Sequence, residues 1–431
     1  MNHDRRAFLA GTGTAFAALL ASGCASRALA GAQANSPYGA LVPDSQGLLD
    51  LPRGFSYRVI ASLGQVMDDG LAVPDNADGM GCFDLGEGKI ALVRNHELKA
   101  HEDGCGTLDA GYDRRKDGVI LPGGTTTQVL DAETLDTVHQ HRSLAGTIRN
   151  CAGGTTPWGS WLTCEEDVTR KGQGVGRSHG WVFEVPADAM GLIDPVPLKA
   201  MGRFNHEAAA IDPATGIVYM TEDREDGLLY RFLPKEPGQL AKGGRLQALA
   251  AKGLGDARNW GGATVSPGSP FSAEWIDLDN VESPNDDLRQ RGAAKGATRF
   301  ARGEGIHMGE DELYFCCTSG GAARHGQVFR LIPSKDRLKL FFESTSPDQF
   351  NYGDNLTVAP NGHLIVCEDQ SGTFVDNHLR GIAPDGSAYP LARLRLQTEL
   401  AGACFSPDGQ TMFVNIFSPA KTLAITGPWV A

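Results

Sequence analysis

The chain has 431 residues, 41% of them hydrophobic, and a formal net charge of −13 at pH 7. This length is ample for a large core, and the 55 glycines indicate many tight turns, which favours β-structure over a helical bundle. The acidic balance, with no basic stripe to neutralise phosphates, argues against a nucleic-acid partner. It is compatible with acids gathered around cations, although a solvated acidic surface is the commoner cause.

The N-terminus has the features of an export signal. The pair Arg5-Arg6 precedes an apolar stretch that ends at Ala21, and Ala28-Leu29-Ala30 forms a small-x-small cleavage site. We therefore expect residues 1–30 to be a twin-arginine (Tat) signal and residues 31–50 to be a linker. The Tat machinery is then a partner, and the mature protein, expected to be a monomer, is periplasmic or secreted. No later stretch is long and apolar enough to span a membrane.

The cysteines raise two questions, about lipidation and about disulfides. An alternative cleavage before Cys24 would make the mature protein a lipoprotein. Eight cysteines follow Cys24, and an even number in an exported chain suggests disulfides. Several of them, however, lie inside apolar strand runs, where a cysteine is usually a small buried hydrophobe. We expect one disulfide at most, between Cys82 and Cys105.

A turn, an apolar strand and a polar end recur along the chain. Four strong copies and two weaker ones end, in chain order, at Glu97, Glu165-Glu166, Glu222-Asp223, Thr318, Glu368-Asp369 and Asn415. Six such units, with Asp-Gly and Asn-Gly turns between strands, predict an all-β fold, a six-bladed β-propeller over residues 51–431. A β-sandwich with long loops is the alternative. Residues 235–298 break the repeat, and Ser283-Pro284 is typical of a helix start, so we expect one partly helical insertion there.

The acids at the strand ends are the candidate site. Residues at one offset in each blade lie on one face of the disc, so we expect several acids to converge on the axis: Glu97, Glu165 or Glu166, Glu222, and Glu368 or Asp369. Carboxylates this close cannot all stay ionised without cations. Oxygen ligands select hard ions such as Ca²⁺, and a thiolate from Cys151 would add a transition metal. For any single acid, a turn former or a solvated side chain is the alternative.

Several motifs resemble the PhoX family of alkaline phosphatases, over about residues 50–420. They are Arg94-Asn95-His96-Glu97, Arg149-Asn150-Cys151-Ala152-Gly153-Gly154, Gly202-Arg203-Phe204-Asn205-His206-Glu207-Ala208, Tyr219-Met220-Thr221-Glu222-Asp223-Arg224, Arg302-Gly303-Glu304-Gly305, Cys317-Thr318-Ser319-Gly320-Gly321 and Asp354-Asn355-Leu356-Thr357. The resemblance implies a Tat-exported, six-bladed propeller that hydrolyses phosphomonoesters with a cluster of Fe³⁺ and Ca²⁺.

The resemblance also implies roles for single residues. Cys151 would be the iron-bound thiolate, with three carboxylate partners: Glu166, Glu222 and Glu304. Further candidates for ligands or supporting groups are Glu97, Glu165, Glu207, Asp223, Glu368 and Asp369. Arg302 matches the arginine that grips the phosphate, a task for which a guanidinium fork is suited. Thr127 stands near the place of a phosphate-binding asparagine, which suggests weaker binding or an altered substrate such as a phosphodiester.

Two other classes of function remain open from the sequence. One is a related propeller hydrolase that acts on phosphodiesters, phosphotriesters or lactones. The other is a non-catalytic propeller that binds calcium or a partner protein. An arginine directed at a metal cluster favours an enzyme over an interaction module, because such a module has no need of it.

Overall fold

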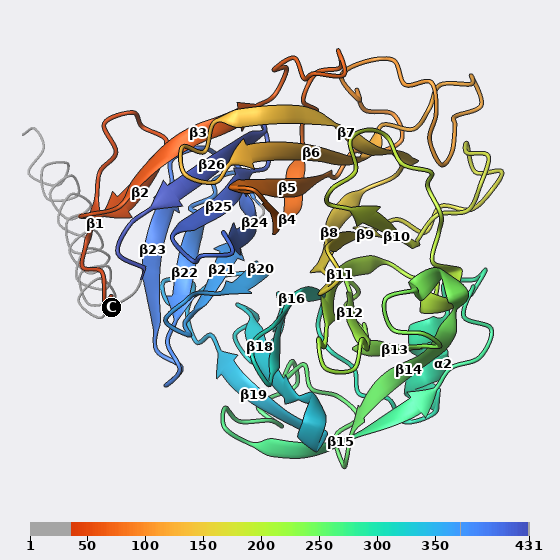
Figure 1. Ribbon diagram of the computed structural model, residues 1–431. Coiled ribbons are helices and arrows are strands. Elements are labelled where there is room, and N and C mark those ends of the chain that lie inside the picture. Colours follow the sequence, from red (N-terminus) through yellow and green to blue (C-terminus); the bar gives the residue numbers. More distant parts are fainter. Residues whose placement is uncertain (1–35, 371, 430–431) are drawn as a thin grey trace, which may run out of the picture.

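A computed structural model describes residues 36–370 and 372–429 of the chain. Its regular structure is almost entirely β-strand, and the one α-helix in these residues is α2 (Leu288–Ala294). Antiparallel sheets stand around a central axis, and the chain follows the ring from orange to blue in Figure 1. The predicted all-β, propeller-like fold is confirmed. None of the described helices is long and apolar enough to cross a membrane.

The strands form six antiparallel meanders, each beginning with the strand nearest the axis. The first three are β4 (Ala77–Gly86), β5 (Lys89–His96), β6 (Gly123–Asp131) and β7 (Thr137–Thr147); β8 (Asn150–Thr155), β9 (Ser160–Glu165) and β10 (Val182–Pro186); and β11 (His206–Ile211), β12 (Val218–Glu222), β13 (Tyr230–Pro234) and β14 (Gly244–Ala251). The next two are β16 (Gly303–Met308), β17 (Leu313–Cys317), β18 (Gln327–Ile332) and β19 (Arg337–Glu343); and β20 (Gly353–Val358), β21 (Leu364–Glu368), β22 (His378–Ile382) and β23 (Ala388–Leu394). The sixth is β24 (Leu400–Phe405), β25 (Thr411–Ile416) and β26 (Lys421–Thr426), completed by β3 (Ser56–Ser62).

The hydrogen-bonded sheets are fewer than the meanders. Strand β15 (Pro270–Asp277) pairs with β14 on one side and with β19 on the other. It therefore joins the third and fourth meanders into one nine-stranded sheet, and the described strands form five sheets in all. Three 3-10 turns lie between strands: Lys199–Met201, Leu240–Lys242 and Pro333–Lys335.

The ring is closed by strands from the two ends of the chain. Strand β3 pairs antiparallel with β26 from Ser56 opposite Thr426 to Ser62 opposite Lys421. The innermost strands β4, β8, β11, β16, β20 and β24 lie against one another in turn, and β24 returns to β4. The six innermost strands therefore surround one central channel.

Two predicted boundaries differ from the structure. The segment 31–50, predicted as a linker, contributes β1 (Leu41–Val42) and the start of β2 (Leu49–Pro52), which pairs with β23. The predicted insertion at 235–298 contains β14 and β15, and β14 pairs with β13 along most of its length. The Ala-rich sequence of β14 has low strand propensity, so tertiary pairing and not local preference makes this segment a strand. The predicted signal at 1–30, with Cys24, lies outside the described residues.

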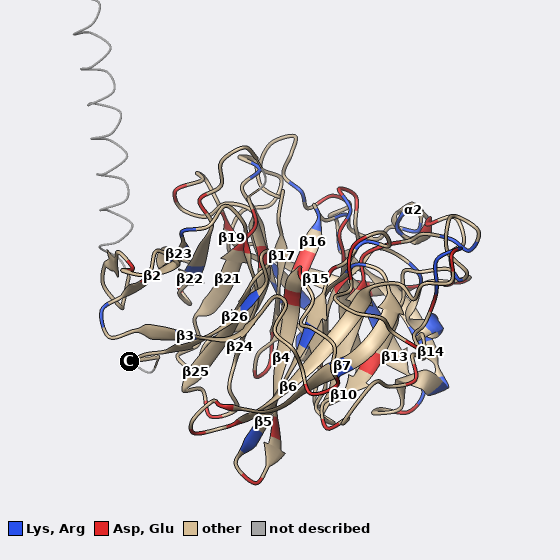
Figure 2. Cartoon of the chain, turned by 90° about the horizontal axis from the view of Figure 1, so that it is seen from above, with Lys and Arg blue, Asp and Glu red and all other residues tan. Residues whose placement is uncertain are grey.

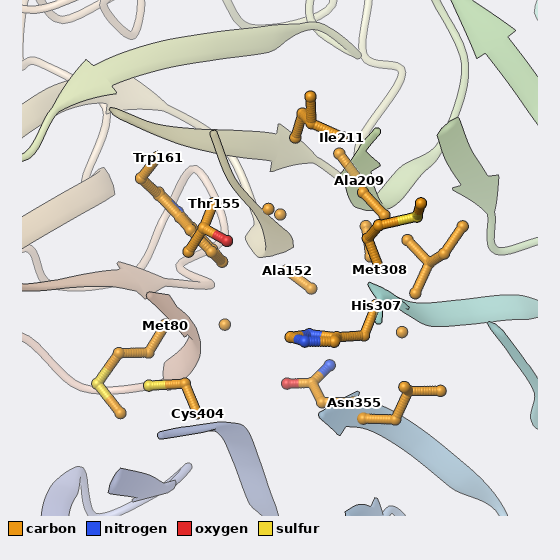
Figure 3. Close-up of a pocket in the computed structure, with 18 of the residues that line it drawn as sticks. Met80, Ala152, Thr155, Trp161, Ala209, Ile211, His307, Met308, Asn355 and Cys404 are labelled. Atoms are coloured by element: carbon orange, nitrogen blue, oxygen red, sulfur yellow. The ribbon is translucent and has the colours of Figure 1, made fainter. Parts of the chain in front are cut away.

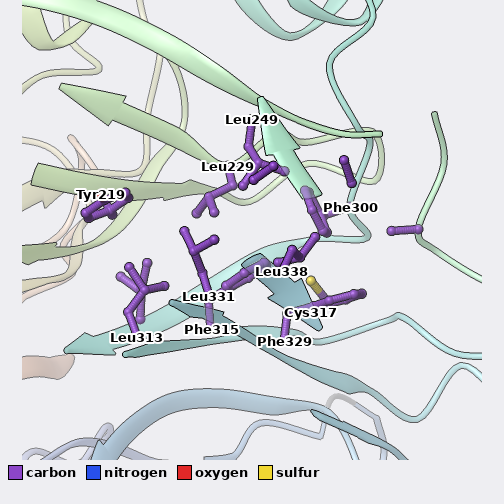
Figure 4. Close-up of a cluster of buried hydrophobic side chains, with 14 of the residues drawn as sticks. Tyr219, Leu229, Leu249, Phe300, Leu313, Phe315, Cys317, Phe329, Leu331 and Leu338 are labelled. Atoms are coloured by element: carbon purple, nitrogen blue, oxygen red, sulfur yellow. The ribbon is translucent and has the colours of Figure 1, made fainter. Parts of the chain in front are cut away.

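The core lies between neighbouring sheets. Figure 4 shows one cluster, in which Phe300, Phe315 and Phe329 pack between the third and fourth meanders. Each such fully buried ring contributes about 2–3 kcal/mol through removal from water. The eight cysteines of the described residues are all free, so the predicted Cys82–Cys105 disulfide is wrong. Cys82 instead packs in the apolar cluster around Met80, between the first and sixth meanders.

Candidate metal centre

A β-bulge interrupts each of the six innermost strands at the same place. The register shifts lie between Ala77 and Met80, Asn150 and Gly153, His206 and Ala209, Gly303 and Ile306, Gly353 and Leu356, and Ala401 and Cys404. A bulge bends its strand and redirects the side chains of the extra residues. The first residues within these six bulges are Asp78, Cys151, Glu207, Glu304, Asp354 and Gly402. Five of the six strands thus present an acid or a thiol at one level of the channel.

Close packing of the innermost strands brings these donors together. A Cβ on Gly79 would lie 2.5 Å from Cα of Ala152, and a Cβ on Gly305 would lie 2.7 Å from Cα of Asn355. At Gly402, where φ is +62°, a Cβ would lie 2.3 Å from the carbonyl oxygen of Asp78. Only glycine fits at these contacts, and this allows neighbouring strands to approach.

The donors form one continuous cluster. Four sets of three residues each offer ligand atoms within 4.8 Å of one another: Asp78, Glu97 and Cys151; Cys151, Glu166 and Glu207; Glu207, Glu304 and Asp354; and Asp354, Asp369 and Glu399. Consecutive sets share Cys151, Glu207 and Asp354, so the chain of donors runs across the channel. In Figure 2 acidic residues accordingly colour segments of the inner strands as well as surface loops.

A second group of donors follows the second strand of a meander. Glu97, Glu166 and Asp369 come directly after the last residues of β5, β9 and β21, and all three belong to the cluster. Asp223 holds the same position after β12 and contacts Arg302, which also contacts Glu304 of the cluster. Adjacent residues of a strand point in opposite directions, so the residue before each of these faces away from the channel.

Those preceding residues stabilise loops and do not contribute to the donor sets. Glu165 accepts hydrogen bonds from the backbone N–H of Gly180 at 2.9 Å and from His179 Nδ1 at 2.6 Å. Glu368 pairs with Arg380 at 2.8 Å, and Glu222 accepts a bond from the Tyr230 hydroxyl at 2.8 Å. The structure therefore does not bring the predicted ligands Glu165, Glu222 and Glu368 to the cluster.

Two arginines contact acids of the cluster, and both stand at the same position relative to the bulge that follows them. Arg302 bonds to Asp223 at 2.7 Å and to Glu304 at 2.8 Å, and Arg149 bonds to Glu97 and Glu166 at 2.6 Å each. Both have left-handed backbone, with φ of 51° and 47°, and both stand two residues ahead of a bulge donor. Their side chains are 36% and 30% exposed, so both guanidinium groups are accessible to a ligand.

The electrostatics of the cluster favour either protonation of its acids or bound cations. Burial raises the pKa of Glu207 well above its usual value, and the neighbouring Glu304 and Asp354 raise it further. Burial and then Asp369 raise the pKa of Asp354 to about 8, and burial and then Asp78 raise the pKa of the Cys151 thiol. Neither carboxylate oxygen of Glu207 has a hydrogen-bond partner among the described residues. Unpaired buried carboxylates are strongly unfavourable, and bound metal ions remove this cost. The donor set fits a multinuclear metal centre.

Sequence reasoning missed four residues of this site and, besides Glu165, Glu222 and Glu368, misplaced Thr127. Asp78, Asp354 and Glu399 belong to the donor sets, and Arg149 contacts them. A signal for the bulge donors was present, because Asp78 and Glu304 each precede a glycine just before an apolar strand. Thr127 is fully buried in the middle of β6, opposite Val93 of β5, and does not reach the cluster. No donor set includes Thr127.

The channel changes character on the other side of the bulges. There a cavity of about 250 Å³ is lined by Met80, Trp161, His307, Met308 and small residues, with no aspartate or glutamate. Figure 3 shows the His307 ring directed into this space, near Asn355. Burial lowers the pKa of His307 to about 4, so its ring is neutral. The acids, and with them any bound cations, are confined to one end of the channel.

An all-β ring with buried carboxylates, one thiol and two accessible arginines at its axis defines a metal-binding propeller protein. The family model for the alkaline phosphatase PhoX matches residues 36–134 and 106–420. The chain belongs to this family, which confirms the resemblance and the predicted class of enzyme, a phosphatase.

Solved structures are similar to this fold. Pseudomonas fluorescens PhoX in complex with vanadate, a transition state analogue, is 20% identical, with 88% of this chain and 96% of that chain covered and a TM-score of 0.70. A gluconolactonase from Xanthomonas campestris is 13% identical, with 91% and 99% covered and a TM-score of 0.43. The WD40 β-propeller domain of Doa1 is 10% identical, with 86% and 97% covered and a TM-score of 0.41. A search of curated protein sequences finds no match.

Proposed function

We propose that this protein hydrolyses phosphate monoesters with a cluster of Fe³⁺ and Ca²⁺ at the end of the propeller channel. The observation that carries the proposal is the run of four overlapping donor sets with arginines beside it. Phosphoryl transfer needs positive charge at the equatorial oxygens and a positioned oxygen nucleophile, and bound metal ions supply both. Family membership supports the same reaction class.

The donor chemistry supports a division of the metals. The two sets that contain Cys151 offer a thiolate with carboxylates, which suits a transition metal such as Fe³⁺. The other two sets offer carboxylate oxygens alone, which suits Ca²⁺. Glu207 belongs to one set of each kind, so its carboxylate would contribute to holding both kinds of metal.

Arg302 is the residue proposed to hold the phosphate. Asp223 and Glu304 take the hydrogen bonds of its Nε and Nη2 atoms, and these contacts fix the plane of the guanidinium. Its Nη1 makes no hydrogen bond within the described residues and presents two N–H groups to a phosphate oxygen. Arg149 is held by the side chains of Glu97 and Glu166 and also donates from Nη1 to the Glu166 carbonyl at 3.0 Å, and we place it as a weaker second contact.

The six-blade count and the location belong to the same proposal. Six innermost strands with the same bulge support six blades, two of them joined through β15. The Arg5-Arg6 signal supports Tat export of a monomer to the periplasm or beyond, with Cys24 as the alternative lipidation site. Replacing Arg5-Arg6 by lysines should retain the protein in the cytoplasm, and unchanged export on fractionation would reject the Tat assignment.

The proposal is tested by hydrolysis of 4-nitrophenyl phosphate with protein of known metal content. We expect phosphate release that disappears after chelation and returns when Fe³⁺ and Ca²⁺ are restored together. Cys151→Ser should lose iron and the visible absorption of a ferric thiolate. Iron- and calcium-loaded protein that releases no phosphate from monoesters would overturn the proposal, and release from a diester alone would change the substrate class.

A further inference from the structure

A second cavity lies on the same face as the metal centre, between the second and third meanders. Its volume is about 300 Å³, and its lining includes Val168, Arg170, Gln173, Arg203, Asn285 and Asp286. These residues come from the loop after β9, the segment before β11 and the segment before α2.

The cavity is a short distance from the cluster along the chain. Val168 is two residues beyond Glu166 of the cluster. Arg203 is two residues before Asn205, whose side-chain amide donates a hydrogen bond to Glu166 at 2.8 Å. The bond from Asn205 to Glu166 thus places the segment that carries Arg203 beside the cluster.

Two guanidinium groups in the cavity have no acidic partner. Arg203 is 2% exposed and bonds only to main-chain carbonyls, those of His179 at 2.7 Å, Ser283 at 3.0 Å and Val168. Arg170 is exposed and bonds to the Pro284 carbonyl at 3.3 Å. Neither forms an ion pair with a described residue. Burial lowers the pKa of Arg203, Asp286 raises it and the nearby Arg170 lowers it again, so the two cations influence each other.

The one acid in the lining is already paired. Asp286 forms ion pairs with Arg289 at 3.1 Å and with Arg224 at 3.5 Å. Its charge is therefore balanced from outside the cavity, and Arg170 and Arg203 are the two cations of the lining; outside the lining, Glu165 and Asp167 also raise the pKa of Arg203. The side-chain amides of Gln173 and Asn285 add neutral hydrogen-bond donors. The protein as a whole has a net charge of −13. Against that background, one buried arginine and one exposed arginine in the same cavity, both without an acidic partner, point to an anionic ligand.

We propose that this cavity is a second anion subsite, which binds a phosphate on the leaving group of the substrate. The proposal rests on the proposed function, because the first phosphate of the same molecule lies at the metal centre. The preferred substrates are then phosphomonoesters that carry a second phosphate group. Arg203 forms the fixed base of the subsite, and Arg170, held by one carbonyl only, closes on the ligand.

The test compares fructose 1,6-bisphosphate with fructose 6-phosphate, which differ by the second phosphate. With metal-loaded wild-type protein, we expect kcat/KM to be about tenfold higher for the bisphosphate, through a lower KM, as a charge-assisted contact provides. Arg170→Ala should remove this preference and leave the rate with fructose 6-phosphate unchanged. Lys171→Ala, which removes the same charge from the next exposed position, should keep the preference, and Arg170→Lys should keep part of it.

The outcomes separate this proposal from the proposed function. Hydrolysis of both sugars with equal kcat/KM, or a preference that survives Arg170→Ala, would overturn the second subsite and leave the phosphatase intact. Release of no phosphate from either sugar would overturn the proposed function. In that case calorimetry tests the subsite independently of hydrolysis. Fructose 1,6-bisphosphate should bind the metal-loaded wild-type protein about tenfold more tightly than it binds metal-loaded Arg170→Ala. Equal affinities would reject the subsite.

Discussion

Two neighbouring glutamates at the end of β9 have opposite environments. Glu165 is fully buried and receives hydrogen bonds from the backbone and from His179. Glu166, one residue later, faces the channel and shares a donor set with Cys151 and Glu207. The same contrast holds for Glu368, which is bonded to Arg380 and His378, beside Asp369, which belongs to a donor set. An acid enclosed by backbone N–H groups and a histidine stabilises the fold, whereas an acid that faces other carboxylates and a thiol across the channel is placed to share a cation with them.

The largest effect is expected from removing a carboxylate on the channel side. Glu207→Gln keeps the size of the side chain but removes the charge that two donor sets share. Metal content should fall, and phosphate release should fall by about a thousandfold or more. The metal-free protein should be about as stable as metal-free wild type, because the raised pKa of Glu207 leaves its carboxyl protonated when no metal is bound. Elemental analysis beside the rate measures both, and full metal content in this variant would contradict the cluster.

The matched control is Glu165→Gln, which changes the glutamate that faces away from the channel. Glu165 lies between His179 and backbone N–H groups, so we expect the free energy of unfolding to fall by about 3 kcal/mol. Metal bound per folded molecule should stay as in wild type. Denaturant unfolding and elemental analysis measure the pair, and loss of metal without loss of stability would mean that the two glutamates have exchanged roles.

The next effect concerns the arginines. Arg302→Ala should lower kcat/KM by about a hundredfold or more with metal retained, because a positioned donor to the developing charge is lost. Arg289 offers the contrast, since it pairs with Glu222 and Asp226 away from the donor sets. Arg289→Ala should reduce stability and leave kcat/KM of the folded enzyme within a few fold. If both variants lose the same activity, Arg302 has no special contact with the phosphate.

The pH dependence of stability tests the ion pairs of Glu165, the glutamate that faces away from the channel. Burial lowers the pKa of His179, but Glu165 and Asp113 raise it, to about 9 in total. The folded pKa lies above the ordinary 6.5, so the stabilisation is fully present below pH 6.5 and is lost as pH rises through 9. The free energy of unfolding should fall by about 3 kcal/mol over that range. Urea unfolding of wild type and His179→Asn measures this, and equal slopes would contradict the ion pairs.

The smallest effect is expected at Thr127. Its hydroxyl is buried with no hydrogen-bond partner among the described residues. Thr127→Val keeps the shape and removes an unsatisfied group, so stability should change by about 1 kcal/mol at most and the variant should not be less stable. The kinetics with 4-nitrophenyl phosphate should equal those of wild type. A raised KM would place Thr127 near the substrate after all.

Much of the site was predictable because its motifs are local. Cys151, Glu304 and Arg302 lie in short segments that resemble the motifs of the family, and this resemblance implies a metal contact and a phosphate contact. Glu399 was not predictable, since it precedes β24 with no neighbouring motif and reaches Asp354 and Asp369 only across the ring. Strand period alone could not select Glu166 over Glu165, because the choice depends on which side of the strand faces the axis.

The sequence by itself determined the all-β class, the repeating strand units and the presence of a carboxylate and thiolate centre, because turns, strand patterns and ligand types are properties of short segments. The tertiary structure decided which acids form the cluster, how β15 joins two meanders and that Cys82 and Cys105 stay apart. It also decided the placement of Arg170 beside Arg203. These features depend on the bulges and on strands that pack across the ring, and such contacts join residues hundreds of positions apart, as when β3 pairs with β26.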